Sequence, residues 1–157
     1  MVPTKQAAAA FLACRRIAVT GVSRNPSGHG SNAVMKRLRE RGYDVVAINP
    51  NAEEAIDGAP CYHHLTEVPG SVEAVVIGTK PERAADTMRE VVDLGITKVW
   101  MHRAFGQGSV DDAATAYGRE HGATVIDGGC PLMFEPTANP VHKVLKLCCG
   151  KKVPKQV

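Results

Sequence analysis

Residues 17–32 read IAVTGVSRNPSGHGSN, an apolar, β-branched run that stops in a segment rich in glycine, serine and asparagine. Such a run is typical of a buried strand that enters a turn-rich loop. Residues 33–41 then place apolar and charged side chains at helical spacing, and Gly42 supplies the helix stop. The segment therefore predicts a strand, a loop of small residues and a helix in direct succession.

The same unit recurs along the chain. Further strands are predicted at residues 44–48, 73–77, 98–102 and 124–127, and further helices at 81–94, 109–121 and 139–149. Short apolar strands that alternate with helices are typical of a parallel sheet covered on both faces. Right-handed crossovers then give a doubly wound, three-layer α/β fold. We predict a five-stranded, mostly parallel sheet in a single domain over residues 1–157. Its core spans about residues 17–136, flanked by an N-terminal helix and a basic C-terminal helix and tail.

Composition narrows the classes of function. The chain has 157 residues, 44% hydrophobic and 22% charged, which is the balance of an ordinary globular protein. Its net charge of +3 comes from the end of the chain, where five lysines and no acidic residue follow Glu135. Without a basic patch in the body we expect no nucleic-acid partner. Without a long apolar run or a recognisable signal peptide we expect no membrane partner and a cytoplasmic location.

Cysteine and histidine offer few candidates for catalysis or metal binding. The five cysteines lack CxxC spacing, which predicts free thiols rather than a disulfide framework or a zinc ribbon. Cys130 follows the last predicted strand and is either a reactive thiol or, more simply, a buried small side chain. His102 at a strand end is an acid–base candidate without a partner carboxylate in sequence reach. The adjacent His63 and His64 are expected in a surface loop. We therefore predict neither a catalytic set nor a metal site.

The loop at residues 21–32 is the strongest candidate for ligand binding. Ligands of open parallel sheets bind outside the carboxyl ends of the strands, where the strand order reverses. This loop leads into a helix N-terminus, which favours a phosphate or diphosphate. It matches neither the G-x-G-x-x-G dinucleotide pattern nor a Walker A loop. The second predicted strand ends in Asn49, where NAD-binding proteins place a carboxylate. An amide tolerates a phosphorylated ribose, so the pattern favours an adenine nucleotide such as coenzyme A.

These segments resemble the small stand-alone CoA-binding-domain proteins, which are related to the nucleotide-binding domain of the succinyl-CoA synthetase α subunit. The resemblance covers roughly residues 10–136 and implies a Rossmann-like fold that holds coenzyme A. It is carried, in chain order, by IAVTGVSRNPS at 17–27, VVAINP at 45–50, VVIGTKP at 75–81, KVWM at 98–101 and VIDGGCP at 125–131.

The resemblance also implies the residues of the coenzyme A site. The residues that match the phosphate loop of the family are Gly21, Ser23, Arg24, Asn25, His29 and Gly30. Matching the segment near the adenosine are Asn49 and Pro50, and matching the turn that borders the adenine and diphosphate are Thr79, Lys80 and Pro81. The synthetase has a lysine shortly after its Asn-Pro pair, whereas this chain reads Asn51-Ala52-Glu53. Lys80 or Arg24 is the expected substitute as a contact to the 3′-phosphate.

The function expected from these observations is binding of CoA or an acyl-CoA without catalytic activity of its own. One alternative is a component of an acyl-CoA ligase or transferase that works with a partner chain. Another is an NAD(P)-dependent oxidoreductase, against which the missing glycine pattern speaks. A third is a regulatory or thiol-protecting role in which CoA caps Cys130. Family likeness suggests a homodimer or a partner enzyme subunit.

Overall fold

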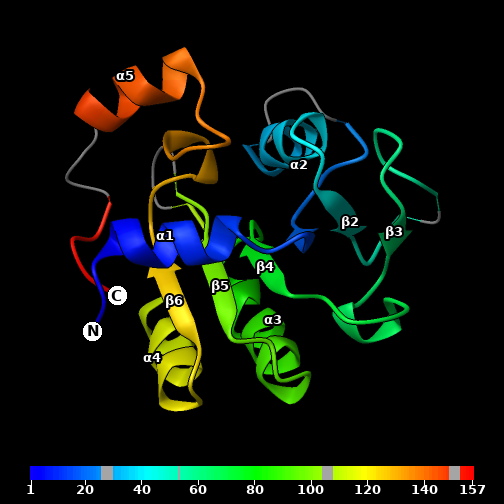
Figure 1. Ribbon diagram of the computed structural model, residues 1–157. Helices are drawn as coiled ribbons and strands as arrows, with labels where there is room; N and C mark the ends of the chain where they lie inside the picture. Colours follow the sequence, from blue (N-terminus) through cyan, green and yellow to red (C-terminus); the bar gives the residue numbers. More distant parts are fainter. Residues whose placement is uncertain (26–29, 53, 104–107, 149–152) are drawn as a thin grey trace.

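A parallel sheet forms the centre of the molecule (Figure 1). The computed structural model describes residues 1–25, 30–52, 54–103, 108–148 and 153–157. Within them the sheet has six strands in the order β3-β2-β1-β4-β5-β6, and every neighbouring pair is parallel. The strands are β1 (Arg16–Thr20), β2 (Asp44–Ile48), β3 (Cys61–Tyr62), β4 (Ala74–Ile77), β5 (Lys98–Met101) and β6 (Thr124–Asp127).

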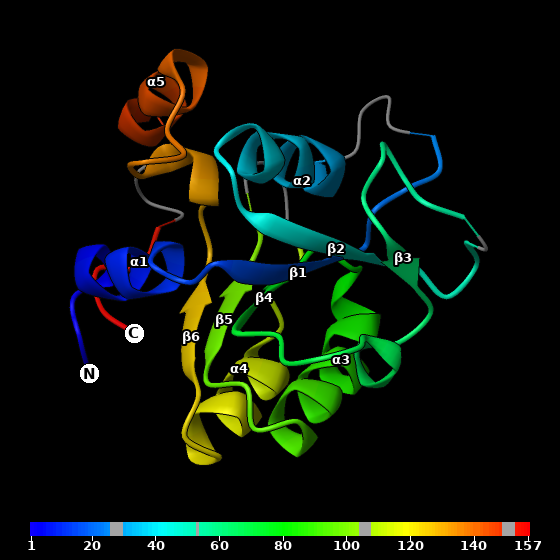
Figure 2. The same ribbon diagram turned by 45° about the vertical axis from the view of Figure 1, so that its right-hand side comes forward.

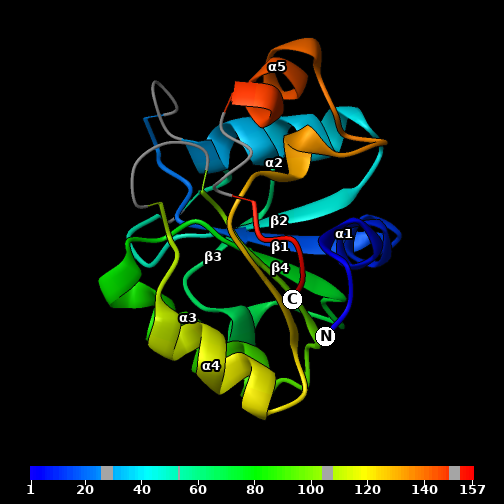
Figure 3. The same ribbon diagram turned by 90° about the vertical axis from the view of Figure 1, so that its left-hand side faces the viewer.

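Helices cover both faces of the sheet, as Figures 2 and 3 show from two sides. The helices are α1 (Thr4–Leu12), α2 (Gly30–Glu40), α3 (Pro81–Asp93), α4 (Asp112–Glu120) and α5 (Pro140–Cys148), with short 3-10 turns η1 (Leu65–Glu67) and η2 (Pro131–Met133). Alternate side chains of each strand face opposite layers. In β1, Ile17 and Val19 pack in the core beneath α1 and α2, whereas Ala18 packs in the core beneath α3. None of the described helices is both long and apolar enough to cross a lipid bilayer.

The predicted fold class is confirmed, but the predicted number of strands is wrong. The described residues form six strands rather than five, because Cys61 and Tyr62 add β3 at the edge beside β2. This strand has only two residues, both half-buried, so it leaves no apolar run in the sequence. Its pairing is fixed by backbone hydrogen bonds across the edge, such as Asn49 N to Tyr62 O at 3.0 Å.

The strand order reverses between β1 and β4. From β1 the chain crosses through α2 to β2 on one side, and the later strands β4, β5 and β6 lie on the other side. The helix after β1 covers one face of the sheet, and the helix after β4 covers the opposite face (Figure 2). The helices that follow β1 and β4 therefore lie on opposite faces of the sheet, and doubly wound sheets bind their ligands at such a switch point.

The two ends of the chain pair with each other (Figure 3). The Val2 amide donates to the Val157 carbonyl at 2.8 Å, and the Val157 amide donates to Val2 at 3.0 Å. The Thr4 hydroxyl at the start of α1 donates to the Pro154 carbonyl at 2.6 Å. The end of the basic tail, residues 153–157, is thus held against α1.

Candidate functional site

The backbones after β1 and β4 pass each other in close contact. Gly21 adopts a φ of +72°, and a Cβ atom there would lie 2.2 Å from the carbonyl oxygen of Gly78. A Cβ atom on Gly78 would in turn lie 1.9 Å from the hydroxyl oxygen of Ser31 in α2. That hydroxyl donates to the Gly78 carbonyl at 3.3 Å. Glycine is therefore required at both positions, and the start of α2 lies directly against the ends of both strands.

Asn32 fixes the loop that follows β1. Its side chain is buried, with Oδ1 accepting a hydrogen bond from the Ser23 amide and Nδ2 donating to the Ser23 carbonyl, both at 2.8 Å. The Ser23 hydroxyl accepts a further bond from the Asn25 amide at 3.1 Å. One buried amide thus holds both polar groups of the Ser23 backbone, and it anchors the loop to the first turn of α2.

The start of α2 is suited to an anion. The first amides of a helix have no partner within the helix, and the helix dipole is positive at that end. No acidic residue lies in the first turn of α2, and none occurs anywhere in residues 16–39. Of the predicted phosphate-loop residues, the structure brings Gly21, Ser23, Arg24, Asn25 and Gly30 to this edge of the sheet, whereas His29 lies outside the described residues.

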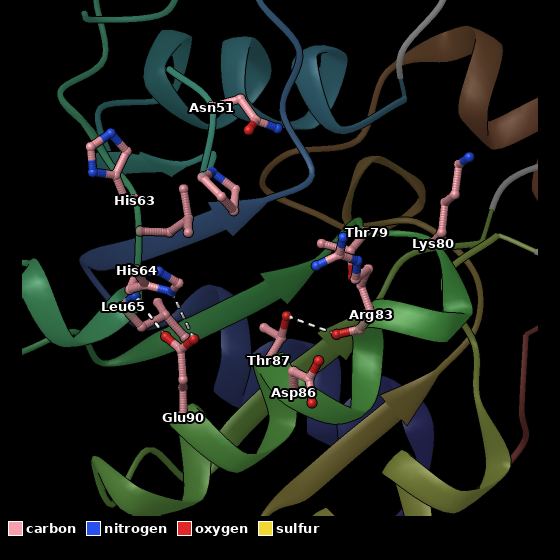
Figure 4. Close-up of a pocket in the computed structure, with 12 residues that line it drawn as sticks. Asn51, His63, His64, Leu65, Thr79, Lys80, Arg83, Asp86, Thr87 and Glu90 are labelled. Carbon is pink, nitrogen blue, oxygen red and sulfur yellow. Dashed lines mark hydrogen bonds and ion pairs between the residues drawn. The ribbon is translucent and has the colours of Figure 1, made fainter. Parts of the chain in front are cut away.

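A cavity of about 460 Å³ opens between the end of β2, η1 and α3 (Figure 4). Its lining residues are Ile48, Pro50, Asn51, His63, His64, Leu65, Thr79, Lys80, Arg83, Asp86, Thr87 and Glu90. Three of the predicted site residues, Pro50, Thr79 and Lys80, are therefore in its wall. Pro81, the first residue of α3, is not among the lining residues.

Asn49 holds two loops together instead of lining the cavity. Its Nδ2 donates to the Val22 carbonyl at 2.9 Å, and its Oδ1 accepts from the Asn51 amide at 2.8 Å. A carboxylate at this position could not donate to Val22. The amide that the sequence placed at the end of β2 therefore joins the loops after β1 and β2, and Pro50 and Asn51 reach the cavity in its place.

Glu90 in the wall of the cavity joins α3 to the segment that contains His64 and Leu65. Both oxygens of Glu90 are used, one by His64 Nδ1 at 3.2 Å and the other by the Leu65 amide at 2.9 Å. The Thr79 hydroxyl, by contrast, is buried without a hydrogen-bond partner in the described part of the chain. A buried hydroxyl without a partner is costly, and a ligand atom in the cavity would satisfy it.

Most of the cavity wall was not predicted from the sequence. Arg83, Thr87 and Glu90 lie at helical spacing on one side of α3, a signal that the helical period alone could have identified. The contribution of His63 and His64 depends on the two-residue strand β3, which has no signal in the sequence. No group of three or more potential metal ligands is found among the described residues.

His102 and Cys130 follow β5 and β6, and the pKa of each keeps its side chain uncharged at pH 7. His102 follows β5 and is 8% exposed, and a Cβ atom on Gly30 would lie 2.7 Å from its Cε1 atom. Burial, followed by the nearby His142, lowers the pKa of His102 to about 4, so its ring is neutral at pH 7. Burial raises the pKa of the Cys130 thiol to about 12. Cys130 is thus a buried small side chain, which is the simpler of the two roles that the sequence allowed.

The chain matches a known protein family over most of its length. The family model described as CoA binding domain matches residues 15–136. The protein YneT of Bacillus subtilis (strain 168) is 29% identical over 116 residues, which cover 74% of this chain and 82% of that protein. A solved structure of a hypothetical protein from Pyrococcus horikoshii OT3 has a TM-score of 0.70 and 28% identity, covering 77% of this chain and 82% of its own.

An acetyl-coenzyme A synthetase from Ca. Korarchaeum cryptofilum is similar over 71% of this chain and 25% of its own. Its TM-score is 0.59 and its sequence identity 22%, so this likeness shows the fold alone.

Proposed function

Because the chain belongs to the family of CoA binding domains, we propose that it binds coenzyme A or an acyl-CoA at the carboxyl ends of its parallel strands. The observation that carries the proposal is that two features suited to a ligand lie at the same end of the sheet. The anion-suited start of α2 lies against the ends of β1 and β4, and the cavity with the unpartnered Thr79 hydroxyl begins at the same strand end.

The diphosphate is assigned to the loop after β1. Asn32 holds this loop in place, and the first turn of α2, which contains no acidic residue, supplies backbone amide donors. Arg24 is an exposed cation of the same loop. Gly21, Gly30 and Gly78 let the loop after β1, the start of α2 and the end of β4 approach one another closely, which fixes the position of this loop.

The adenosine is assigned to the cavity beside α3. A volume of about 460 Å³ lies within the usual range of small-molecule sites. Ile48, Pro50 and Leu65 supply apolar surface for a base, and the Thr79 hydroxyl supplies a hydrogen-bonding group that has no other partner in the described chain. The chemistry of the lining therefore fits an adenine nucleotide.

Binding without turnover is the simplest form of this proposal. Within the described residues no serine, threonine or cysteine side chain is hydrogen-bonded to a histidine or a carboxylate, which is the arrangement that activates a nucleophile. The neutral, buried His102 and the un-ionised Cys130 do not supply one.

Isothermal titration with CoA, NAD and NADP tests the proposal. We expect heat with CoA and none with either dinucleotide. Arg24→Ala and Lys80→Ala should each weaken CoA binding by about 10-fold, since a hydrogen bond to a charged group contributes roughly 1.5–3 kcal/mol. Arg15→Ala, at the amino end of β1, removes the same charge away from the site and should change nothing. Binding of NAD or NADP without binding of CoA would contradict the proposal.

A second candidate function is a component of an acyl-CoA ligase or transferase. It is favoured by the recurrence of this fold as about one quarter of an acetyl-coenzyme A synthetase chain. This candidate predicts a partner chain that co-purifies and supplies the nucleophile. Acyl-CoA formation by the isolated chain from a carboxylate, CoA and ATP would contradict both the proposal of binding without turnover and the proposal of a ligase component that needs a partner chain.

A further inference from the structure

The carboxylates of the cavity already have partners within the protein. Glu90 binds His64 and the Leu65 amide through its two oxygens. Asp86 forms an ion pair with Arg89 at 2.7 Å, on the exposed surface of α3. Both carboxylates are therefore engaged by groups of the protein before any ligand arrives.

Arg83 is a cation of the same cavity without such a partner. In the part of the chain that the structure describes, its guanidinium makes no hydrogen bond and no ion pair, although it lines the cavity together with Thr79. Figure 4 shows its side chain extending from α3 in the direction of Thr79, whereas Lys80 extends to the side of the view opposite His63. The five N–H donors of Arg83 and the unpartnered Thr79 hydroxyl thus border one space.

The position of Arg83 within α3 does not stabilise the helix. Pro81 is the first residue of α3, so Arg83 lies in its first turn, near the positive end of the helix dipole. A cation is unfavourable there, whereas an anion is favourable. A bound anion next to Arg83 would therefore interact with both the guanidinium and the start of α3.

We infer that Arg83, assisted by Thr79, forms a subsite for a phosphomonoester on the ribose. Arg83 then selects a 3′-phosphorylated nucleotide over the same nucleotide without that phosphate. This inference rests on the proposed binding of CoA. It supplies a cation that the segment after β2 lacks, since Asn51 follows Pro50 there. A guanidinium matches a phosphate with two parallel donors, a geometry that a lysine does not provide.

The test compares CoA with dephospho-CoA, which differs from it only by the 3′-phosphate, in titrations of the wild type, Arg83→Gln, Arg83→Lys and Arg15→Gln. We expect the wild type to bind CoA at least about 10-fold more tightly than dephospho-CoA. Arg83→Gln should lose this preference through weaker CoA binding, with dephospho-CoA affinity changed less than about twofold. Arg83→Lys should keep part of the preference. Arg15→Gln, which removes an equal charge at the amino end of β1, should keep the full preference for CoA.

Two results would overturn the inference while leaving the proposed function intact. One is wild-type protein that binds CoA and dephospho-CoA equally well. The other is an Arg83→Gln variant that either keeps the full preference or loses affinity for both ligands by the same factor. Wild-type protein that binds neither ligand would instead contradict the proposed function itself. Higher salt should weaken CoA binding more in the wild type than in Arg83→Gln, because the lost contact is ionic.

Discussion

Gly21 and Gly78 lie so close together that a Cβ atom on Gly21 would be 2.2 Å from the Gly78 carbonyl oxygen. The contact joins the loop after β1 to the end of β4, the two strands between which the sheet reverses its order. The junction between the ends of β1 and β4 is therefore formed by backbone atoms in close contact. Its dimensions depend on the absence of two side chains as much as on the presence of others.

Replacing Gly21 with alanine should weaken both folding and CoA binding. The new Cβ atom has to displace the β4 end, which we expect to cost about 1–3 kcal/mol, as overpacking does. Gly42→Ala is the matched control, because Gly42 has a φ of +83° but nothing within 4 Å of its Cβ position. The control should lose only the roughly 1–2 kcal/mol of left-handed strain and keep its CoA affinity. Urea unfolding and titration measure the two effects; equal losses in both variants would show that the close contact is unimportant.

Asn32→Ala should loosen the phosphate loop. The variant removes both hydrogen bonds to Ser23 and leaves two backbone groups without partners, at a cost of about 1–3 kcal/mol. We expect a clear loss of CoA affinity as well. Asn139→Ala is the control, since the Asn139 side chain accepts a hydrogen bond from the His142 amide at the start of α5 and makes none to the loop after β1. It should lower the free energy of unfolding by about 1 kcal/mol without changing CoA affinity. Unchanged CoA affinity in Asn32→Ala would exclude a role of the loop in binding.

His102 should make the fold less stable in mild acid. Its pKa is about 4 when folded and 6.5 when unfolded, so between these values the unfolded chain binds a proton that the folded chain does not. The free energy of unfolding therefore falls as the pH is lowered from about 6.5 to about 4, by something on the order of 3 kcal/mol. Burial lowers the pKa of His142 as well, which adds a contribution of the same sign.

Urea unfolding of wild type and His102→Gln between pH 7 and pH 4 measures this dependence. The variant should lose most of the slope, because glutamine does not titrate. His121→Gln, which changes an exposed histidine at the end of α4, should retain the wild-type slope. A slope in His102→Gln as steep as that of the wild type would assign the acid sensitivity to other groups.

Cys130 should resist thiol reagents in the folded protein. It is 1% exposed, and a pKa of about 12 leaves almost no thiolate at pH 8. Alkylation with iodoacetamide followed by peptide mass mapping should find Cys130 unmodified in buffer and modified in urea. The half-buried Cys61 should react earlier. A native Cys130 adduct, or a mixed disulfide between Cys130 and CoA, would restore the thiol-protecting alternative.

The longer elements were predictable because each carries its own signal. The apolar runs of β1, β2 and β4 are buried, and α3 begins at Pro81, as its missing amide hydrogen allows. The strand β3 was not predictable, because two half-buried residues have no periodicity. The cavity wall was therefore predicted only in part. Pro50, Thr79 and Lys80 follow directly from strand ends, whereas His64 and Glu90 meet only once β3 and α3 are packed.

The sequence by itself determined the alternation of strands and helices, the glycine-rich loop after the first strand and the membership of a family of CoA binding domains. These properties are local, since each depends on residues close together along the chain. Only the tertiary structure decided that Asn49 joins two loops, that Asn32 holds Ser23, and that Arg83 lines the cavity without an ionic partner among the described residues. Such relationships depend on backbone groups and on residues distant in the chain, and neither hydrophobic period nor motif spacing encodes them.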